Sequence, residues 1–336
     1  MKNKIFLSLI IPVHNSQKTI ELLLLSINHS QFKNFKDIEV VIVDDASTDT
    51  TLRVVEALRP KLKFILKTIV QKKNIGPARA RNLGVKKALG EYVLFLDSDI
   101  QLKKNSLQRV FSLFKKGKIK ALTGIWHYQQ KTTKFFPQFK ALRDWSYWFI
   151  ERERNFRYYL FSTRVAGIEK KLFQTLRGFN QNYPEPTVED IELTYRIERL
   201  TPIKFCPNIV VAHEFEDFWP IAIKYFKRSR DWIKLYIRRL RFDPVATSKK
   251  EAVKSIISSN FLLLFLLSFI SPLFLYPATI FVLFFAYLEM QFWWFLLEKK
   301  GILFLLKAIP VSIILYFIIN LGAAWGFFLY ILKPKK

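Results

Sequence analysis

Two carboxylates lie one residue apart in Asp97-Ser98-Asp99, which directly follows the apolar run Tyr92–Leu96. The run has the length and composition of a strand that is buried on both faces. Burying unpaired carboxylates is costly, so we expect Asp97 and Asp99 to emerge at the carboxyl end of the strand, where open α/β sheets bind ligands. Such a pair can share a divalent cation with substrate phosphates. Alone, the tripeptide is more often a solvated turn, so this assignment depends on the motifs around it.

Three further polar motifs follow strands predicted at residues 5–13, 38–43 and 63–70. They are Pro12-Val13-His14-Asn15, Asp44-Asp45-Ala46-Ser47-Thr48-Asp49 and Asn74-Ile75-Gly76-Pro77-Ala78-Arg79-Ala80-Arg81-Asn82. Segments with helical periodicity lie between the strands. The alternation of strand and helix from residue 5 to residue 99 predicts an α/β domain with a parallel, doubly wound sheet. The first apolar run begins like a secretory signal, but no small-residue cleavage site follows it, so we interpret it as a strand.

The pattern becomes less regular after Asp99. We expect a helix at residues 105–116, strands at 121–128 and 203–212, and a short strand and helix within 167–176. The pair Glu189-Asp190 falls in the first turn of a helix that Thr187 could cap, a position that favours acidic residues for structural reasons alone. The aromatic segment 135–159 fits either a helical lid, packed on the sheet or the membrane surface, or part of an acceptor groove.

The chain is strongly basic, with 54 Lys and Arg residues against 27 Asp and Glu residues and a formal net charge of +27. Such a balance suits either a nucleic-acid binder or a protein at an anionic lipid surface. Residues 221–254 combine many basic residues with an apolar stripe, which is typical of an interfacial amphipathic helix. A solvated helix packed on the catalytic domain is the alternative. Cys206 is the single cysteine, so no intrachain disulfide can form.

The carboxyl-terminal tail is almost entirely apolar. Residues 256–275 and 278–297 each approach the roughly 20 residues that span a bilayer, and a third span is expected from about residue 309 to 332. Three spans are our prediction, and two spans with a re-entrant or interfacial piece are the alternative. The polybasic segment before the first span places the catalytic domain in the cytoplasm by the positive-inside rule. Three spans would put the terminal lysines outside, which the same rule disfavours. The apolar tail favours lipid over nucleic acid as partner.

Taken in order, these motifs resemble those of family 2 glycosyltransferases with the GT-A fold. The resemblance covers roughly residues 5–215 and rests on five motifs in the right order, including Ser8-Leu9-Ile10-Ile11-Pro12-Val13-His14-Asn15 and the late Glu189-Asp190 pair. It implies a GT-A nucleotide-diphospho-sugar transferase fold of the α/β class, Rossmann-like with a mostly parallel sheet. It also implies Mg²⁺ or Mn²⁺ as cofactor and a nucleotide-sugar donor.

The resemblance assigns roles residue by residue. Asp45 would hydrogen-bond the nucleotide base in a pocket lined by Pro12 and His14, and Arg81 would sit near the base or the diphosphate. Asp97 and Asp99 would position the donor and the metal, with Asp99 favoured as the direct ligand. Asp190 would be the general base, and His213 could be a third metal ligand. The donor-binding set implied is Pro12, His14, Asn15, Asp45, Asn74, Gly76, Arg81, Asp97 and Ser98.

Each role has a structural alternative and a chemical justification. Asp190 could serve only as a helix cap, His213 could be structural, and Asn15, Asn74 and Gly76 could serve only their turns. A bound cation neutralises the charge that develops on a departing diphosphate. A carboxylate opposite the leaving group can take the proton from an attacking hydroxyl, and direct attack inverts the anomeric centre.

We therefore predict a GT-A catalytic domain at residues 1–215, a basic amphipathic interfacial segment at 216–255 and a transmembrane domain at 256–336. The predicted activity is an inverting transfer of sugar to a lipid-linked or glycan acceptor, by a multi-pass protein of the cell membrane whose catalytic domain is cytoplasmic. Anionic lipids are the expected partner, and nucleic acid is not. A processive polysaccharide synthase and a non-catalytic basic membrane scaffold are the alternatives. Trp232 lies near Arg230, but the Gln and adjacent Arg-Trp of the synthase motif are missing.

Overall fold

The computed structural model describes residues 4–152, 159–183 and 185–332. It divides into two compact units, one formed by Met1–His127 and Phe156–Glu214, the other by Tyr128–Asn155 and Phe215–Lys336. Residues 128–155, which we predicted within the catalytic domain, therefore belong to the second unit. Their aromatic side chains pack into an apolar cluster with residues of the C-terminal helices, including Phe292 and Leu315.

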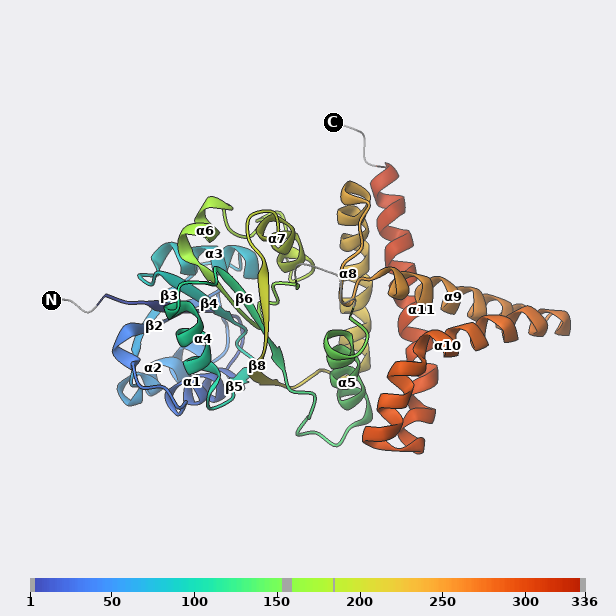
Figure 1. The fold of residues 1–336 in the computed structure, drawn as a ribbon, viewed down its shortest axis with the longest axis horizontal. Coiled ribbons are helices and arrows are strands. Elements are labelled where there is room, and N and C mark those ends of the chain that lie inside the picture. The colour runs from blue at the N-terminus through green and yellow to red at the C-terminus, as the bar shows by residue number, and fades with distance from the viewer. Residues whose placement is uncertain (1–3, 153–158, 184, 333–336) are drawn as a thin grey trace. The chain divides into compact units, whose positions relative to one another are not determined.

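An eight-stranded sheet forms the centre of the first unit, in the order β3-β2-β1-β4-β7-β6-β8-β5 (Figure 1). The strands are β1 (Leu7–Val13), β2 (Ile38–Asp44), β3 (Ile65–Val70), β4 (Tyr92–Leu96), β5 (Ile100–Leu102), β6 (Ala121–Trp126), β7 (Val165–Glu169) and β8 (Ile203–His213). β1 to β4 are mutually parallel, and β6 is parallel to β8. β7 is antiparallel to both β4 and β6, and β5 is antiparallel to β8. The predicted α/β class with a mostly parallel sheet is confirmed.

The helices of the first unit connect these strands and cover the sheet. They are α1 (Ile20–Asn28), α2 (Thr51–Leu58), α3 (Pro77–Lys87), α4 (Ser106–Lys115), α6 (Lys170–Thr175) and α7 (Glu189–Ile197), with short 3-10 turns at Phe35–Asp37 and Arg59–Lys61. α3 packs on β1 and β2, and α4 packs on β8. β1, β2 and β4 are buried on both faces almost throughout, which explains their nearly continuous apolar sequences.

The second unit consists of helices. They are α5 (Phe135–Phe149), α8 (Phe218–Arg239), α9 (Lys249–Leu267), α10 (Leu275–Lys300) and α11 (Ile302–Leu332), with a 3-10 turn at Pro272–Phe274. The basic segment predicted as one helix over 221–254 is interrupted after Arg239, where Leu240 adopts a left-handed conformation and Pro244 follows. By length and composition, two segments among the described residues could cross a membrane, Pro272–Lys300 and Ile302–Leu332.

α8 and α11 lie side by side at unusually short range. A Cβ atom added to Gly322 would lie 2.4 Å from the backbone oxygen of Phe226, and one added to Gly326 would lie 2.2 Å from that of Arg230. The two glycines are four residues apart and therefore share one face of α11. This small-xxx-small pattern lets two helix backbones approach closely.

A buried network of charged side chains joins α5, α9 and α10. Lys254 Nζ lies 2.5 Å from Glu289, 2.8 Å from Glu251 and 2.8 Å from Glu151. Arg143 pairs with Glu151 at 2.7 Å and with Glu289 at 3.1 Å. All five side chains are nearly inaccessible to solvent. Burial alone would raise the pKa of Glu151, but Arg143 and Lys254 lower it to about 2, so this carboxylate stays ionised.

We expect Lys254→Met to destabilise the second unit strongly, because it leaves three buried carboxylates with one remaining buried cation. Breaking a buried pair in this way typically costs about 3–5 kcal/mol. The matched control is Lys250→Met, since Lys250 is one-third exposed and lies 3.8 Å from Glu151. Thermal unfolding in detergent should show a clear loss for the first variant and little change for the second. Equal melting temperatures for Lys254→Met and the unmodified protein would show that the network does not hold these helices together.

Candidate active site

The loops after β1 and β2 are joined by hydrogen bonds. The His14 ring nitrogen Nδ1 lies 2.8 Å from the backbone oxygen of Asp45, to which it can donate. Asn15 donates its backbone N–H to Ser47 Oγ at 3.0 Å and accepts from the Thr48 N–H at 2.9 Å. Asn15 has a positive φ of 50°, which Asn tolerates better than most residues. The structure thus gives Asn15 a role in loop geometry, and His14 and Asn15 remain exposed beside the end of β1.

Asp45 holds the third predicted loop in place. Its two carboxylate oxygens accept the backbone N–H groups of Ile75 at 2.7 Å and Gly76 at 2.9 Å. Gly76 adopts a φ of 84° as the residue before α3, and Asn74 Oδ1 accepts from the same N–H at 3.1 Å. We predicted a base-binding role for Asp45 from the family resemblance. The contacts observed are structural, and they position the loop beside Pro12 and His14 at the carboxyl edge of the sheet.

Arg81 connects two motifs that are far apart in the sequence. It projects from α3, is buried, and donates to Asp97 Oδ1 at 2.7 Å and to Glu189 Oε1 at 3.2 Å. Burial alone would lower the pKa of its guanidinium, but the charges of Asp97, Glu189 and Asp190 raise it above the ordinary value. Asp97, which follows β4, and the acidic pair that opens α7 therefore meet around one cation. The family resemblance placed Arg81 near the nucleotide.

Asp99 turns toward a different partner. Its Oδ2 lies 3.3 Å from His213 Nε2 at the end of β8, and its side chain is 51% exposed. The neighbours Ile100 and His213 are opposite one another where β5 pairs with β8. Burial would raise the pKa of Asp99, but the hydrogen bond from His213 and the positive charges of His213 and Arg164 lower it. Ser98 contacts Ser16 through their hydroxyl oxygens at 2.9 Å, which joins this loop to the one after β1.

The three residues predicted as metal ligands do not form one cluster. Within residues 4–152, 159–183 and 185–332, no three His, Cys, Asp or Glu side chains are grouped so that they could hold a metal by themselves. The predicted trio is divided, because Asp97 pairs with Arg81 while Asp99 and His213 face each other. Mg²⁺ is commonly held by one or two carboxylates together with substrate phosphates, and Asp99 is a half-exposed carboxylate of this kind. Of the predicted trio, only Asp99 and His213 lie in contact with each other.

Asp190 lies in the first turn of α7, partly exposed, with Oδ1 accepting the N–H of Ile191 at 2.8 Å. This is the helix-start position that the sequence predicted. Its charge acts on Arg81, which places it in the same neighbourhood as Asp97. The position allows a role as base, although none of these contacts by itself requires one.

The sequence motifs did not identify two residues that lie near the site, Asn82 and Arg164. Asn82 exchanges two hydrogen bonds of 2.8 Å with the backbone of Phe179, which fixes the loop before α7 against α3. Arg164 precedes β7, stacks on Trp126 at 4.5 Å and contributes positive charge at Asp99. Asn82 stood within a recognised motif, but nothing in the sequence indicated its partner. No sequence motif around Arg164 indicated that it would lie near the site.

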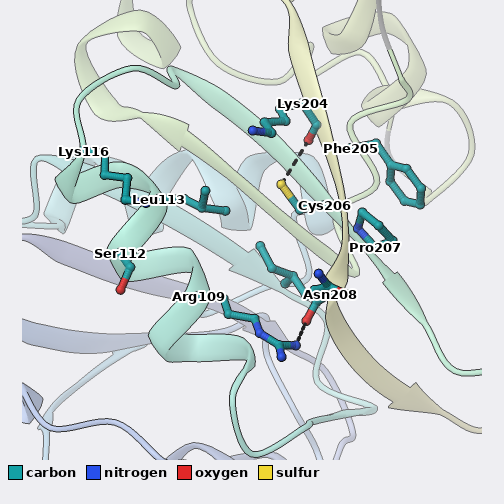
Figure 2. Close-up of a pocket in the computed structure, with 10 residues that line it drawn as sticks. Arg109, Ser112, Leu113, Lys116, Lys204, Phe205, Cys206, Pro207 and Asn208 are labelled. Atoms are coloured by element: carbon teal, nitrogen blue, oxygen red, sulfur yellow. Dashed lines mark hydrogen bonds between the residues drawn. The ribbon is translucent and has the colours of Figure 1, made fainter.

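A separate hollow of about 380 Å³ lies between α4 and β8 (Figure 2). Arg109 at its rim donates to the backbone oxygen of Asn208, and Cys206 faces the backbone of Lys204. Burial raises the pKa of the Cys206 thiol to about 11, which makes it a poor nucleophile. None of the predicted site residues lines this hollow, so it is not the candidate active site.

The sequence model of the family described as "Glycosyl transferase family 2" matches residues 8–173. This match includes the loops after β1 and β2, the third loop with Arg81, and Asp97-Ser98-Asp99. The chain carries a family 2 glycosyltransferase domain. The predicted family and enzyme class are confirmed.

Similar proteins support the same assignment. TarS of Staphylococcus aureus, a poly(ribitol-phosphate) beta-N-acetylglucosaminyltransferase, is 43% identical over 101 residues, which are 30% of this chain and 17% of TarS. A GalNAc(5)-diNAcBac-PP-undecaprenol beta-1,3-glucosyltransferase of Campylobacter jejuni is 35% identical over 114 residues, 33% of this chain and 35% of that protein. The chain thus spans less than a fifth of TarS and about a third of the Campylobacter enzyme.

A solved structure aligns with most of this chain. The mannosyltransferase PcManGT from Pyrobaculum calidifontis, in complex with GDP-Man and Mn²⁺, aligns with a TM-score of 0.56 over 96% of this chain and 84% of that chain, at 16% identity. This similarity shows the fold, which is the predicted GT-A fold.

We expect Arg81→Met to unfold the first unit at a lower temperature, because it leaves Asp97 and Glu189 together without their cation. The expected cost is about 3–5 kcal/mol. Arg81→Lys should be intermediate, since an ammonium can reach one carboxylate but cannot form the two-armed contact. The control is Arg79→Met on the exposed face of α3, which should change stability by less than about 0.5 kcal/mol. A fully stable Arg81→Met protein would show that this ion pair does not organise the site.

Proposed function

We propose that the chain transfers a sugar from a nucleotide-sugar donor to an acceptor at the cytoplasmic face of the membrane, with inversion at the anomeric carbon. One observation carries the proposal: Arg81 joins Asp97, which follows β4, to the Glu189-Asp190 pair that opens α7, at the carboxyl edge of the sheet. Ligands of open α/β sheets bind at this edge. Gathering Asp97, Glu189 and Asp190 at one place is energetically unfavourable, and a non-catalytic scaffold would not require it.

In this proposal the donor lies across the loops after β1, β2 and β3. Pro12, His14 and Asp45 would surround the base, and Asn15, Asn74 and Gly76 would shape the loops that receive it. Asp99 and His213 would hold Mg²⁺ or Mn²⁺, with Asp97 and Ser98 beside the donor. The bound ion would supply the charge that offsets the leaving diphosphate. PcManGT was solved with GDP-Man and Mn²⁺ together, which supports this combination for a protein of the same fold.

Asp190 would accept the proton of the attacking acceptor hydroxyl. Arg81 would hold Asp97 and Glu189 in place, so that the start of α7 and the end of β4 face the same reacting centre. Attack from the side opposite the leaving group inverts the configuration. For this role, a general base must lie within hydrogen-bond reach of the acceptor hydroxyl and must have a suitable pKa.

The acceptor is proposed to be lipid-linked or a glycan. One relative acts on poly(ribitol-phosphate) according to its name, and another on an undecaprenol-linked saccharide. The apolar second unit and the basic α8 suit an acceptor that resides at an anionic membrane. Nucleic acid is not part of this proposal, because the basic residues of α8 adjoin the most apolar helix of the chain.

Asp99→Asn should reduce metal-dependent turnover by about 100-fold, the scale seen when one group that stabilises developing charge is removed. The measurement is release of nucleoside diphosphate from a panel of nucleotide sugars, with Mg²⁺ and Mn²⁺ titrated separately and a chelator as the metal-free reference. Asp37→Asn, which alters a carboxylate that accepts from Asn34, is the control. Unchanged turnover in Asp99→Asn, or full activity in the chelator, would contradict a metal at this position.

The length of the product tests the alternative function. Products that contain many sugars would indicate a processive synthase.

Asp190→Asn separates two kinds of acceptor. A hydroxyl acceptor must lose a proton, so its transfer should slow by about 10²–10⁴-fold. A phosphate acceptor is already ionised near neutral pH, so its transfer should change little. Glu192→Gln on the same helix, whose carboxylate pairs with Arg196, serves as control. Equal losses with both acceptors would show that Asp190 does not act as the base.

A further inference from the structure

The α9–α10 hairpin exposes an apolar surface that no other described part of the chain covers. α9 and α10 run side by side and project away from the α8–α11 pair (Figure 1). No charged residue occurs from Ser255 to Leu288. The exposed large apolar residues of this stretch are Ile256, Leu263, Phe265, Leu266, Phe269, Ile270, Leu273, Leu275, Tyr276, Ile280, Leu283, Phe284 and Tyr287. A surface of this kind indicates contact with a membrane or a partner.

The uncharged arms of the hairpin are too short to cross a bilayer. The helical part from Ser255 to Leu267 and the part from Leu275 to Leu288 are each about 20 Å long at 1.5 Å per residue. The hydrocarbon core of a bilayer is about 30 Å thick. The turn between the arms contains only Ser, Pro and apolar residues. The hairpin can therefore enter the hydrocarbon without its turn reaching the opposite surface.

The charged network lies at the base of the hairpin. Lys254 immediately precedes the uncharged stretch and Glu289 immediately follows it, and the two side chains pair at 2.5 Å. Arg143, Glu151 and Glu251 complete the cluster around them. Ionised groups are expensive within hydrocarbon even when paired. The cluster therefore marks the level at which the hairpin leaves the bilayer, and longer insertion of α10 would carry Glu289 and its partners inside.

α11 is long enough to cross a membrane, but its pairing with α8 opposes this. Gly322 meets Phe226 and Gly326 meets Arg230, so the two helices run in the same direction. Given an equal rise per residue, α8 accompanies α11 from about residue 314 to its end. α8 carries Lys224, Lys227, Arg228, Arg230, Lys234, Arg238 and Arg239. If the part of α11 that lies beside α8 crossed the bilayer, it would draw basic residues such as Lys224, Lys227 and Arg230 into the hydrocarbon, where charged side chains are costly.

We propose that the second unit is a monotopic membrane module that occupies one face of an anionic bilayer. The tip of the α9–α10 hairpin, residues 263–287, lies within the hydrocarbon, and both ends of the hairpin return to the same side. α11 lies along the interface, with α8 presenting its basic residues to anionic headgroups. This attachment is independent of which sugar or acceptor the enzyme uses. It stands in place of the multi-pass arrangement that hydropathy predicts.

Cysteine accessibility tests the topology. In a full-length Cys206→Ser background, single cysteines are placed at Ser271 in the hairpin turn and at Lys299 near the end of α10. The protein is added to preformed, sealed vesicles that contain phosphatidylglycerol, and a membrane-impermeant maleimide is supplied outside, inside, or after detergent. We expect Lys299→Cys to react from outside, and Ser271→Cys to react only after detergent. A bimane label at Ser271→Cys should be quenched by lipids brominated deep in the acyl chains.

Two results would overturn the proposal. Reaction of Ser271→Cys only with reagent trapped inside the vesicles would show that the hairpin crosses the bilayer. Reaction of Ser271→Cys from outside at the rate of Lys299→Cys would show that the hairpin does not insert. Because the readout is labelling of the folded protein and needs no turnover, its failure is distinct from failure of the proposed activity.

A charge at the tip provides a second, independent measurement. Ile270→Lys should weaken partition into these vesicles by at least tenfold, while Leu200→Lys, at an exposed apolar residue of the first unit, should not. Vesicles of phosphatidylcholine alone should bind the unmodified protein more weakly than those with phosphatidylglycerol. Unchanged partition of Ile270→Lys, or equal binding to both kinds of vesicle, would contradict the insertion of the tip or the role of α8.

Discussion

The first unit depends on one buried ionic contact, in which the guanidinium of Arg81 holds Asp97 on one side and Glu189 on the other. A parallel sheet can bring the ends of neighbouring strands together, but α7 reaches this edge only after a long excursion of the chain. The planar fork of Arg suits such a junction, because its donors can serve two carboxylates at fixed angles. Replacing Arg81 would leave the two carboxylates together without their cation, so the contact constrains the end of β4 and the start of α7 jointly.

Much of this unit could be predicted from the sequence. The runs that became β1, β2 and β4 are apolar because both faces of each strand are covered, and polar motifs follow where those strands end. The partners of the polar residues could not be predicted, since they depend on distances across the sheet. Asp45, expected to meet a base, accepts two backbone N–H groups of the third loop. Arg164 approaches Asp99 from a segment without any recognisable motif.

The apolar tail shows a different limit of prediction from sequence. Hydropathy shows whether the residues of a segment are compatible with hydrocarbon. It does not show which other helices pack against that segment. The sequence of α11 satisfies the length criterion, and the same helix presents Gly322 and Gly326 to the backbone of a basic helix. Likewise, the segment from Tyr128 to Ile150 interrupts the catalytic pattern yet packs with the tail, because its aromatic side chains contact apolar partners there.

Each of the two units gathers acidic side chains around buried cations, and the consequences for function differ. Around Arg81 the acids exceed the base in number and Asp190 keeps access to solvent, as Asp99 does beside His213, so negative charge remains available for a cation or a proton. In the second unit, Arg143 and Lys254 face three acids in a site closed to solvent, where each of these carboxylates contacts a cation. A closed network of this kind can fix the geometry of helices but offers no group to a substrate. Exposure, more than the number of charges, therefore distinguishes the site suited to chemistry from the one suited to anchoring the hairpin.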